Sequence, residues 1–125
     1  MITQKRYILD LTIEGLPATY NATAMKSHWF KIRNKNLWKD LISHHVRGLE
    51  PKQGPLAKAR CSLTRCSSKA PDYDGLVQSF KPVLDGLVQS GILIDDAMSV
   101  IGKPEYQWEP AKRGQGSIKI SVEEL

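Results

Sequence analysis

The chain has 125 residues, of which 41% are hydrophobic, and this length and composition are typical of one globular domain over residues 1–125. No stretch is long and apolar enough to cross a membrane, and the first residues lack the apolar core of a signal peptide. We therefore expect a cytoplasmic protein without membrane contact. Lysine and arginine outnumber the acidic residues by 18 to 13, so the net charge is +5.

The charges are unevenly divided along the chain. Residues 1–71 hold 13 basic and 4 acidic side chains, whereas residues 72–96 hold one lysine and five aspartates. The basic part favours a polyanionic partner such as DNA. Carboxylates repel such a partner unless a cation lies between them, so the acidic segment predicts a bound metal ion.

The first half of the chain predicts a strand, a helix and a second strand. Loosely alternating apolar residues indicate a strand over 6–14, and glycine and proline mark a loop over 15–23. Residues 36–48 follow the spacing of an amphipathic helix, and residues 56–66 predict the second strand. Three basic side chains of that strand are expected to face outward: Lys58, Arg60 and Arg65.

The second half predicts one more helix and two more strands. Residues 74–90 have helical spacing, with Asp74 as the predicted N-cap. Pro82 lies inside this pattern, so the helix should either kink there or restart with Pro82 in its first turn. Residues 99–108 and 117–122 predict the last strands. The order β-α-β-α-β-β predicts an α+β fold, a small mixed β-sheet with about two packed helices.

Cysteine and histidine are weak candidates for the chemistry. Cys61 and Cys66 are five residues apart in a predicted strand, so they should lie on opposite faces as unpaired, buried or half-buried thiols. His44 and His45 are adjacent on a predicted helix and point about 100° apart, which prevents them from readily sharing a ligand. His28 has no second histidine close to it in the sequence.

Four polar residues of the second helix share one face beside its apolar stripe, provided that the proline does not break the register: Asp74, Gln78, Lys81 and Asp85. Asp72 can join them from an extended segment before the helix, and a compact return of the chain can bring back Asp95 or Asp96. Hard oxygen ligands suit magnesium or manganese, which activate water in nucleases. The alternative is a set of ordinary structural roles: an N-cap, an ion pair and a turn.

Three linked motifs resemble the RusA family of Holliday junction resolvases. They are PDYDGL over 71–76, KPVLDGL over 81–87, and GILIDD over 91–96. The family shows Asp-x-Asp-Asn, a helix with Lys-x-x-x-Asp-x-Leu, and then a glycine and an Asp-Asp pair before a valine-containing strand. Here Val100 follows the pair. The segment 16–21 is similar to the proline loop of the family, which ends in asparagine.

The resemblance implies a homodimeric, Mg²⁺-dependent endodeoxyribonuclease of bacterial or phage origin, for which Mn²⁺ can substitute. Such an enzyme resolves four-way DNA junctions in recombination and repair by paired cleavage of two strands. The resemblance assigns the catalytic and metal-binding carboxylates to Asp72, Asp74 and Asp96, and the catalytic lysine to Lys81. Asp85 and Asp95 are expected to support them.

Two departures from the family pattern affect this assignment. Gly75 replaces the usual asparagine, and Lys81 follows Asp74 by seven residues rather than four, so strict spacing would put Gln78 in the place of the lysine. We favour Lys81, because its spacing to Asp85 is kept and three additional residues make nearly one helical turn.

A basic cluster around Trp29 is the first candidate for phosphate contacts: Lys26, Lys31, Arg33 and Lys35. Lys69 is a further candidate, while Trp38 lies on the apolar stripe and should be core. The cluster would otherwise be an ordinary solvated loop. Two other functions remain open: a non-catalytic phage protein that binds branched or single-stranded DNA, and a small phage protein whose acidic face binds another protein.

Overall fold

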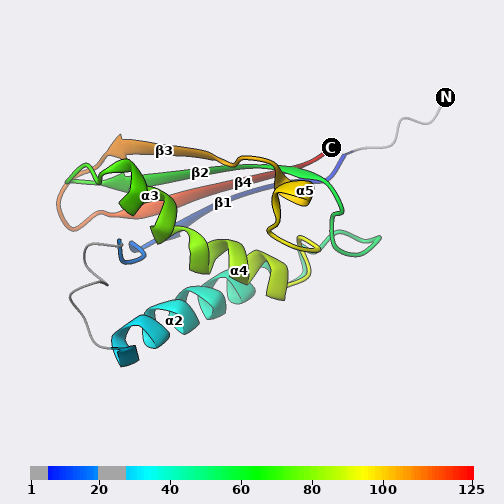
Figure 1. Cartoon of the computed structure of the whole chain (residues 1–125), viewed down its shortest axis with the longest axis horizontal. Coiled ribbons are helices and arrows are strands. Elements are labelled where there is room, and N and C mark those ends of the chain that lie inside the picture. Colours follow the sequence, from blue (N-terminus) through cyan, green and yellow to red (C-terminus); the bar gives the residue numbers. More distant parts are fainter. Residues whose placement is uncertain (1–5, 20–27) are drawn as a thin grey trace.

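A four-stranded mixed sheet organises the fold, with the strand order β1-β4-β2-β3 (Figure 1). The computed structural model describes residues 6–19 and 28–125. The strands are β1 (Ile8–Glu14), β2 (Ala59–Ser67), β3 (Glu105–Pro110) and β4 (Ser117–Glu124). β4 is antiparallel to both β1 and β2, whereas β3 runs parallel to β2. The predicted α+β class is confirmed.

The helices cover one face of this sheet (Figure 1). They are α2 (His28–Val46), α3 (Tyr73–Ser79), α4 (Lys81–Gln89) and the short α5 (Met98–Ile101). α2 and α4 lie side by side beneath the strands, and α3 leads directly into the start of α4. No helix of the described residues covers the opposite face.

The core lies between the sheet and the pair α2–α4. Period-two alternation points the apolar residues of β1 and β4 toward the helices, and α2 contributes Trp38 and Ile42, as its apolar stripe predicted. Gly86 of α4 allows the two helices to approach closely, because a Cβ at that position would lie 2.8 Å from the Cβ of Ile42. Within the described residues, no helix is long and apolar enough to cross a membrane.

Two predicted element boundaries in the first half are wrong. The first helix begins at His28 rather than near residue 36, because its first turns carry mostly basic and aromatic residues that hide the apolar period. The second strand begins at Ala59, since Leu56 forms only an isolated bridge with Leu93. Arg65 was expected to face outward, but it points to the helix side and is 8% exposed.

The predicted second helix is divided in two. α3 ends and α4 begins at Phe80, and Pro82 lies in the first turn of α4, which confirms the predicted restart. Asp72 rather than Asp74 is the N-cap of α3. The single predicted strand over 99–108 is wrong, because its first residues form α5 before β3 begins.

The two cysteines agree with expectation, since Cys61 and Cys66 are both free and buried. Burial raises the pKa of the Cys61 thiol to about 11. The thiol therefore stays protonated and behaves as a small apolar group.

Candidate functional site

The acidic segment lies in the connection that joins the parallel strands β2 and β3. A parallel pair needs such a crossover, and here it contains α3, α4 and α5. After α4 the chain turns back at Gly91 (φ 82°), and Leu93 pairs with Leu56 beside the sheet. This return brings the Asp95–Asp96 pair back to the beginning of α4.

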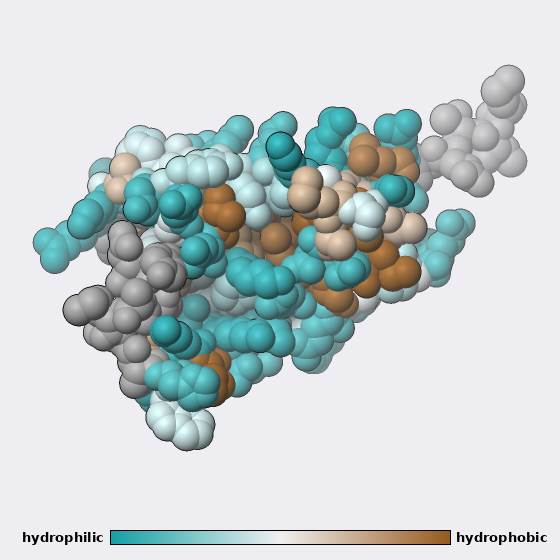
Figure 2. Space-filling model, in the orientation of Figure 1, coloured by the Kyte–Doolittle hydropathy of each residue, from teal (hydrophilic) through white to brown (hydrophobic). Residues whose placement is uncertain are grey.

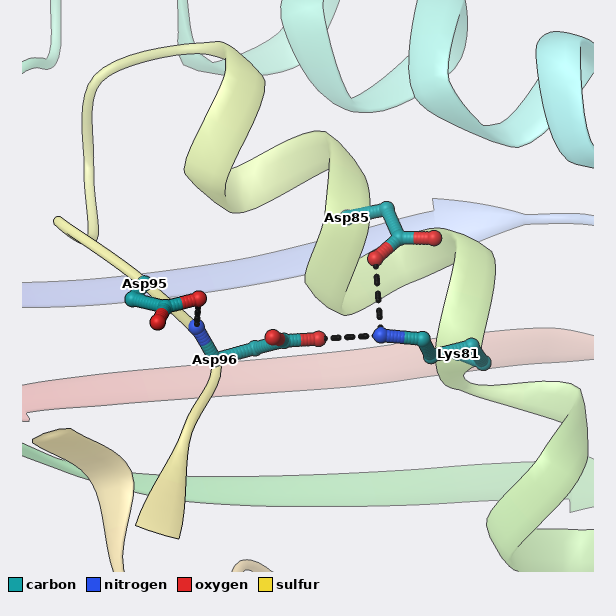
Figure 3. A network of polar contacts seen from close by, with 4 residues as sticks. All are labelled: Lys81, Asp85, Asp95 and Asp96. Atoms are coloured by element: carbon teal, nitrogen blue, oxygen red, sulfur yellow. Dashed lines mark hydrogen bonds and ion pairs between the residues drawn. The ribbon is translucent and has the colours of Figure 1, made fainter. Parts of the chain in front are cut away.

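Lys81 lies between two carboxylates (Figure 3). Its Nζ is 3.0 Å from Oδ1 of Asp85, four residues later on α4, and 2.5 Å from Oδ2 of Asp96. Oδ1 of Asp95 accepts the backbone N–H of Asp96 at 2.8 Å and so steadies the turn. The Lys-x-x-x-Asp motif and the Asp-Asp motif, 15 residues apart at Lys81 and Asp96, therefore meet in one network.

Lys81 and Asp96 favour each other's charged form. The hydrogen bond from Lys81 lowers the pKa of Asp96, and the same bond raises the pKa of Lys81. Both side chains of the pair remain accessible, at 62% for Lys81 and 21% for Asp96. A ligand can therefore reach the network from solvent and exchange for one of its members.

Asp72 and Asp74 lie at the beginning of α3 and are both exposed. Oδ1 of Asp72 accepts the N–H of Gly75 at 2.9 Å, while Asp74 occupies the first turn. The departure from the family at Gly75 has a local reason here. A Cβ at this position would be only 2.6 Å from Oδ1 of Asp72, so a larger residue would displace the capping carboxylate.

The predicted polar stripe is only partly formed. The break at Phe80 interrupts the helical register between Gln78 and Lys81, and the contact between Lys81 and Asp85 is the part of the stripe that the structure shows. Gln78 is exposed on α3 and makes no described contact with these aspartates. The Lys81 position is therefore the one that lies in the acidic network.

The donor chemistry of the segment suits Mg²⁺, but the carboxylates are not gathered into one cage. Among residues 6–19 and 28–125, no three His, Cys, Asp or Glu side chains lie close enough to hold a metal ion. Asp85 and Asp96 converge instead on the ammonium of Lys81. A divalent cation bound at Oδ2 of Asp96 would take the place of that ammonium.

Tyr106 on β3 is a residue that the sequence motifs did not reveal. It is half-buried on the helix side of the sheet, with its ring centroid 6.1 Å from that of Phe80. Its pKa is raised mainly by burial, and further by Tyr73 and Asp96, while Lys81 opposes the change. The phenol therefore lies near the start of α3 and the Lys81 network. Tyr106 is paired with the core residue Leu63 of β2, and this pairing is what indicates that its ring points toward the helices. The sequence does not reveal the pairing.

The basic candidates gather at the first turns of α2. Lys31, Arg33 and Lys35 are exposed there beside Trp29, which is 69% exposed, whereas Lys26 lies outside the described residues. Lys69 is exposed in the loop after β2. In Figure 1 the beginnings of α2 and α3 lie toward the same end of the molecule, and Figure 2 shows hydrophilic side chains over much of this face.

A scan against models of known protein families gives no match, and a search of curated proteins finds no relative. The resemblance to a family therefore depends on the sequence motifs alone.

Proposed function

We propose that this chain is a magnesium-dependent endodeoxyribonuclease that resolves four-way DNA junctions in the cytoplasm of a bacterium or of a phage-infected cell. One observation carries the proposal. The lysine motif and the Asp-Asp motif, remote in sequence, meet where Lys81 contacts Asp85 and Asp96. A purely structural turn would not need to return to that lysine.

The residues divide into three tasks. Asp72, Asp74 and Asp96 would hold Mg²⁺ or Mn²⁺, which supplies an activated water and neutralises charge on the leaving oxygen. Lys81 places a positive charge where a phosphate approaches, and Asp85 orients it through the 3.0 Å ion pair. In this scheme a DNA phosphate would take the place of Asp96 as the partner of Lys81, and the metal ion would take the place of Lys81 as the partner of Asp96.

The rest of the molecule supplies the affinity for DNA. The exposed side chains of Lys31, Arg33 and Lys35 offer phosphate contacts on one helix, and Lys69 lies shortly before Asp72. Phosphate contacts position a nucleic acid without reading its sequence, which suits an enzyme that recognises branch shape.

Cleavage of a synthetic four-way junction tests the proposal. Wild-type protein is incubated with the labelled junction in Mg²⁺, in Mn²⁺ or in a chelator, with a linear duplex of equal length as control. We expect symmetric nicks in the junction with either metal and none with the chelator. Asp96→Asn should remove the nicks without lowering junction affinity. Metal-independent cutting, or equal cutting of the duplex, would contradict it.

A second candidate is a non-catalytic protein that binds branched or single-stranded DNA. It is favoured by the internal neutralisation of Lys81 by Asp85 and Asp96, which leaves this network complete without a metal. Under this alternative the wild-type protein retards the junction in a gel shift but leaves every strand intact in Mg²⁺.

A further inference from the structure

Arg65 is a charged residue buried at the helix side of β2, with 8% of it exposed. Burial lowers the pKa of its guanidinium, because the charged form loses water. All 13 acidic residues of the chain lie within the described ranges 6–19 and 28–125, and none of the ion pairs formed there includes Arg65. The cation is therefore buried without a carboxylate to neutralise it.

The guanidinium binds the loop that follows β1. Nη1 of Arg65 donates to the carbonyl oxygen of Pro17 at 2.6 Å. The next residue of the loop, Ala18, donates its N–H to Oδ1 of Asn34 on α2 at 3.2 Å. The segment 16–19 is thus held from the sheet on one side and from α2 on the other.

The end of this loop lies close to the start of α3, with Thr19 beside Gly75. A Cβ built on Gly75 would lie 3.6 Å from the Cβ of Thr19 and 2.6 Å from Oδ1 of Asp72. The N–H of Gly75 donates to that same Asp72 oxygen at 2.9 Å. Thr19 and the Asp72 carboxylate therefore lie beside the same open side of Gly75, so a displacement of Thr19 changes the surroundings of that carboxylate.

Within residues 6–19 and 28–125 the acceptor shown for this guanidinium is the Pro17 carbonyl, and burial of a charge without a carboxylate partner costs free energy that an apolar side chain of similar volume avoids. Residues that stability does not favour are expected where function requires them. We propose that Arg65 is a positioning residue: it holds the loop 16–19 against α3 and thereby fixes the carboxylate of Asp72. Its effect on cleavage rests on the proposed function, whereas its effect on the loop does not.

Three variants test this inference: Arg65→Met, Arg65→Lys, and Arg60→Met as the matched control at an exposed arginine of the same strand. Amide hydrogen exchange at Gly75 is followed by NMR, alongside urea unfolding, junction affinity and single-turnover cleavage. For Arg65→Met we expect exchange at Gly75 at least about tenfold faster, with an unchanged or higher unfolding midpoint. Cleavage should be slower by about tenfold or more at unchanged junction affinity, because displaced catalytic groups lose rate rather than binding.

Arg65→Lys should recover part of both effects, since an ammonium can also donate to the Pro17 carbonyl, and Arg60→Met should change neither. Unchanged exchange at Gly75 in Arg65→Met would overturn the inference whether or not the protein cuts DNA. Cleavage that falls only in proportion to the folded fraction would also overturn it, because the role would then be structural. A wild-type protein that cuts no junction refutes the nuclease proposal, and the exchange measurement still decides the role of Arg65 in holding the loop.

Discussion

Asp72 is assigned two tasks that can be separated by substitution. As the N-cap of α3 it needs a side-chain oxygen to accept the N–H of Gly75, and as a metal ligand it needs a negative charge. Asparagine keeps an oxygen acceptor but removes the charge, whereas alanine removes both. The two substitutions therefore distinguish helix capping from metal binding.

We predict that Asp72→Asn abolishes junction cleavage but changes the free energy of unfolding by less than about 0.5 kcal/mol, because asparagine caps a helix as well as aspartate. Asp72→Ala should abolish cleavage and also cost about 1 kcal/mol of stability. Urea unfolding and single-turnover cleavage measure the two effects. Near-wild-type nicking by Asp72→Asn in Mg²⁺ would remove Asp72 from the metal site.

The pair formed by Lys81 and Asp96 predicts a pH dependence of stability. The pKa of Asp96 is lowered by the hydrogen bond from Lys81, so its contribution is present above the pKa of the unfolded chain and is lost as the pH falls through the folded value. The pKa of Lys81 is raised, so its contribution is lost as the pH rises through its folded value. The interaction is therefore strongest around neutral pH.

A double-mutant cycle with Lys81→Met and Asp96→Asn should give a favourable coupling energy at about pH 7 that decreases as the pH falls through the folded pKa of Asp96. Urea unfolding of the four proteins across this pH range provides the measurement. A coupling that persists in acid would show that shape rather than charge joins the two side chains.

Among individual residues, the contacts that depend on local spacing could be predicted from the sequence. The pairing of Lys81 with Asp85 follows from a four-residue interval on a helix. The inward direction of Arg65 was missed because its charge suggested exposure, although the alternation of Ala59, Cys61 and Leu63 with polar residues places position 65 on the buried side. The network at Asp96 needed the family resemblance, since periodicity cannot predict where a chain returns.

Among the elements, the closest helix contact is at Gly86 of α4. The position that a Cβ would take there is 2.8 Å from the Cβ of Ile42 on α2, closer than real Cβ contacts allow. The two hydroxyl groups of Ser43 and Ser90, 3.0 Å apart, add a polar contact between α2 and the end of α4. The spacing of the two helices is therefore set by a missing side chain.

Gly86→Ala should destabilise the protein by about 1–3 kcal/mol, because an added methyl in a packed core forces the helices apart. Thermal or urea unfolding gives the value. The double variant Gly86→Ala with Ile42→Ala should cost less than the sum of the two single changes, since truncating Ile42 makes room for the methyl. Additive costs would show that the helices are not in steric contact here.

The order of elements was predictable, but their ends were less so. Even loose alternation identified β1, the segment 117–122 identified β4, and of the two outcomes expected at Pro82 the structure shows the restart of a helix. α5 was mistaken for strand because a four-residue helix is too short to show a period. The parallel pairing of β2 with β3 depends on the whole chain and has no local signal.

For the whole molecule, charge predicts the response of DNA binding to salt. If lysines and arginines such as those at the start of α2 make about 4–6 phosphate contacts, counterion release gives a log–log slope of affinity against salt of about −4 to −5. Fluorescence anisotropy with a catalytically inactive variant measures this slope. A DNA affinity that does not change with salt would favour the hypothesis that the acidic face binds another protein.

We also predict a homodimer. One metal site cuts one strand, whereas resolution of a four-way junction needs paired cuts that a twofold-symmetric dimer can place on opposite strands. Sedimentation equilibrium should give about twice the 14.0 kDa mass of the chain, both free and on junction DNA. A monomer under both conditions would leave a nicking enzyme that cannot resolve junctions by itself.

The crossover between β2 and β3 has a consequence for the order of folding. β4 pairs with both β1 and β2, so its docking closes residues 15–116 and 68–116 into loops at an entropic cost, and β3 docks on β2 within the second loop. The contact between Lys81 and Asp85 is local to α4, whereas the contact between Lys81 and Asp96 spans 15 residues and depends on the return of the chain after Gly91. We therefore expect a partly folded chain to carry the basic side chains of α2 before the network of Lys81 is complete.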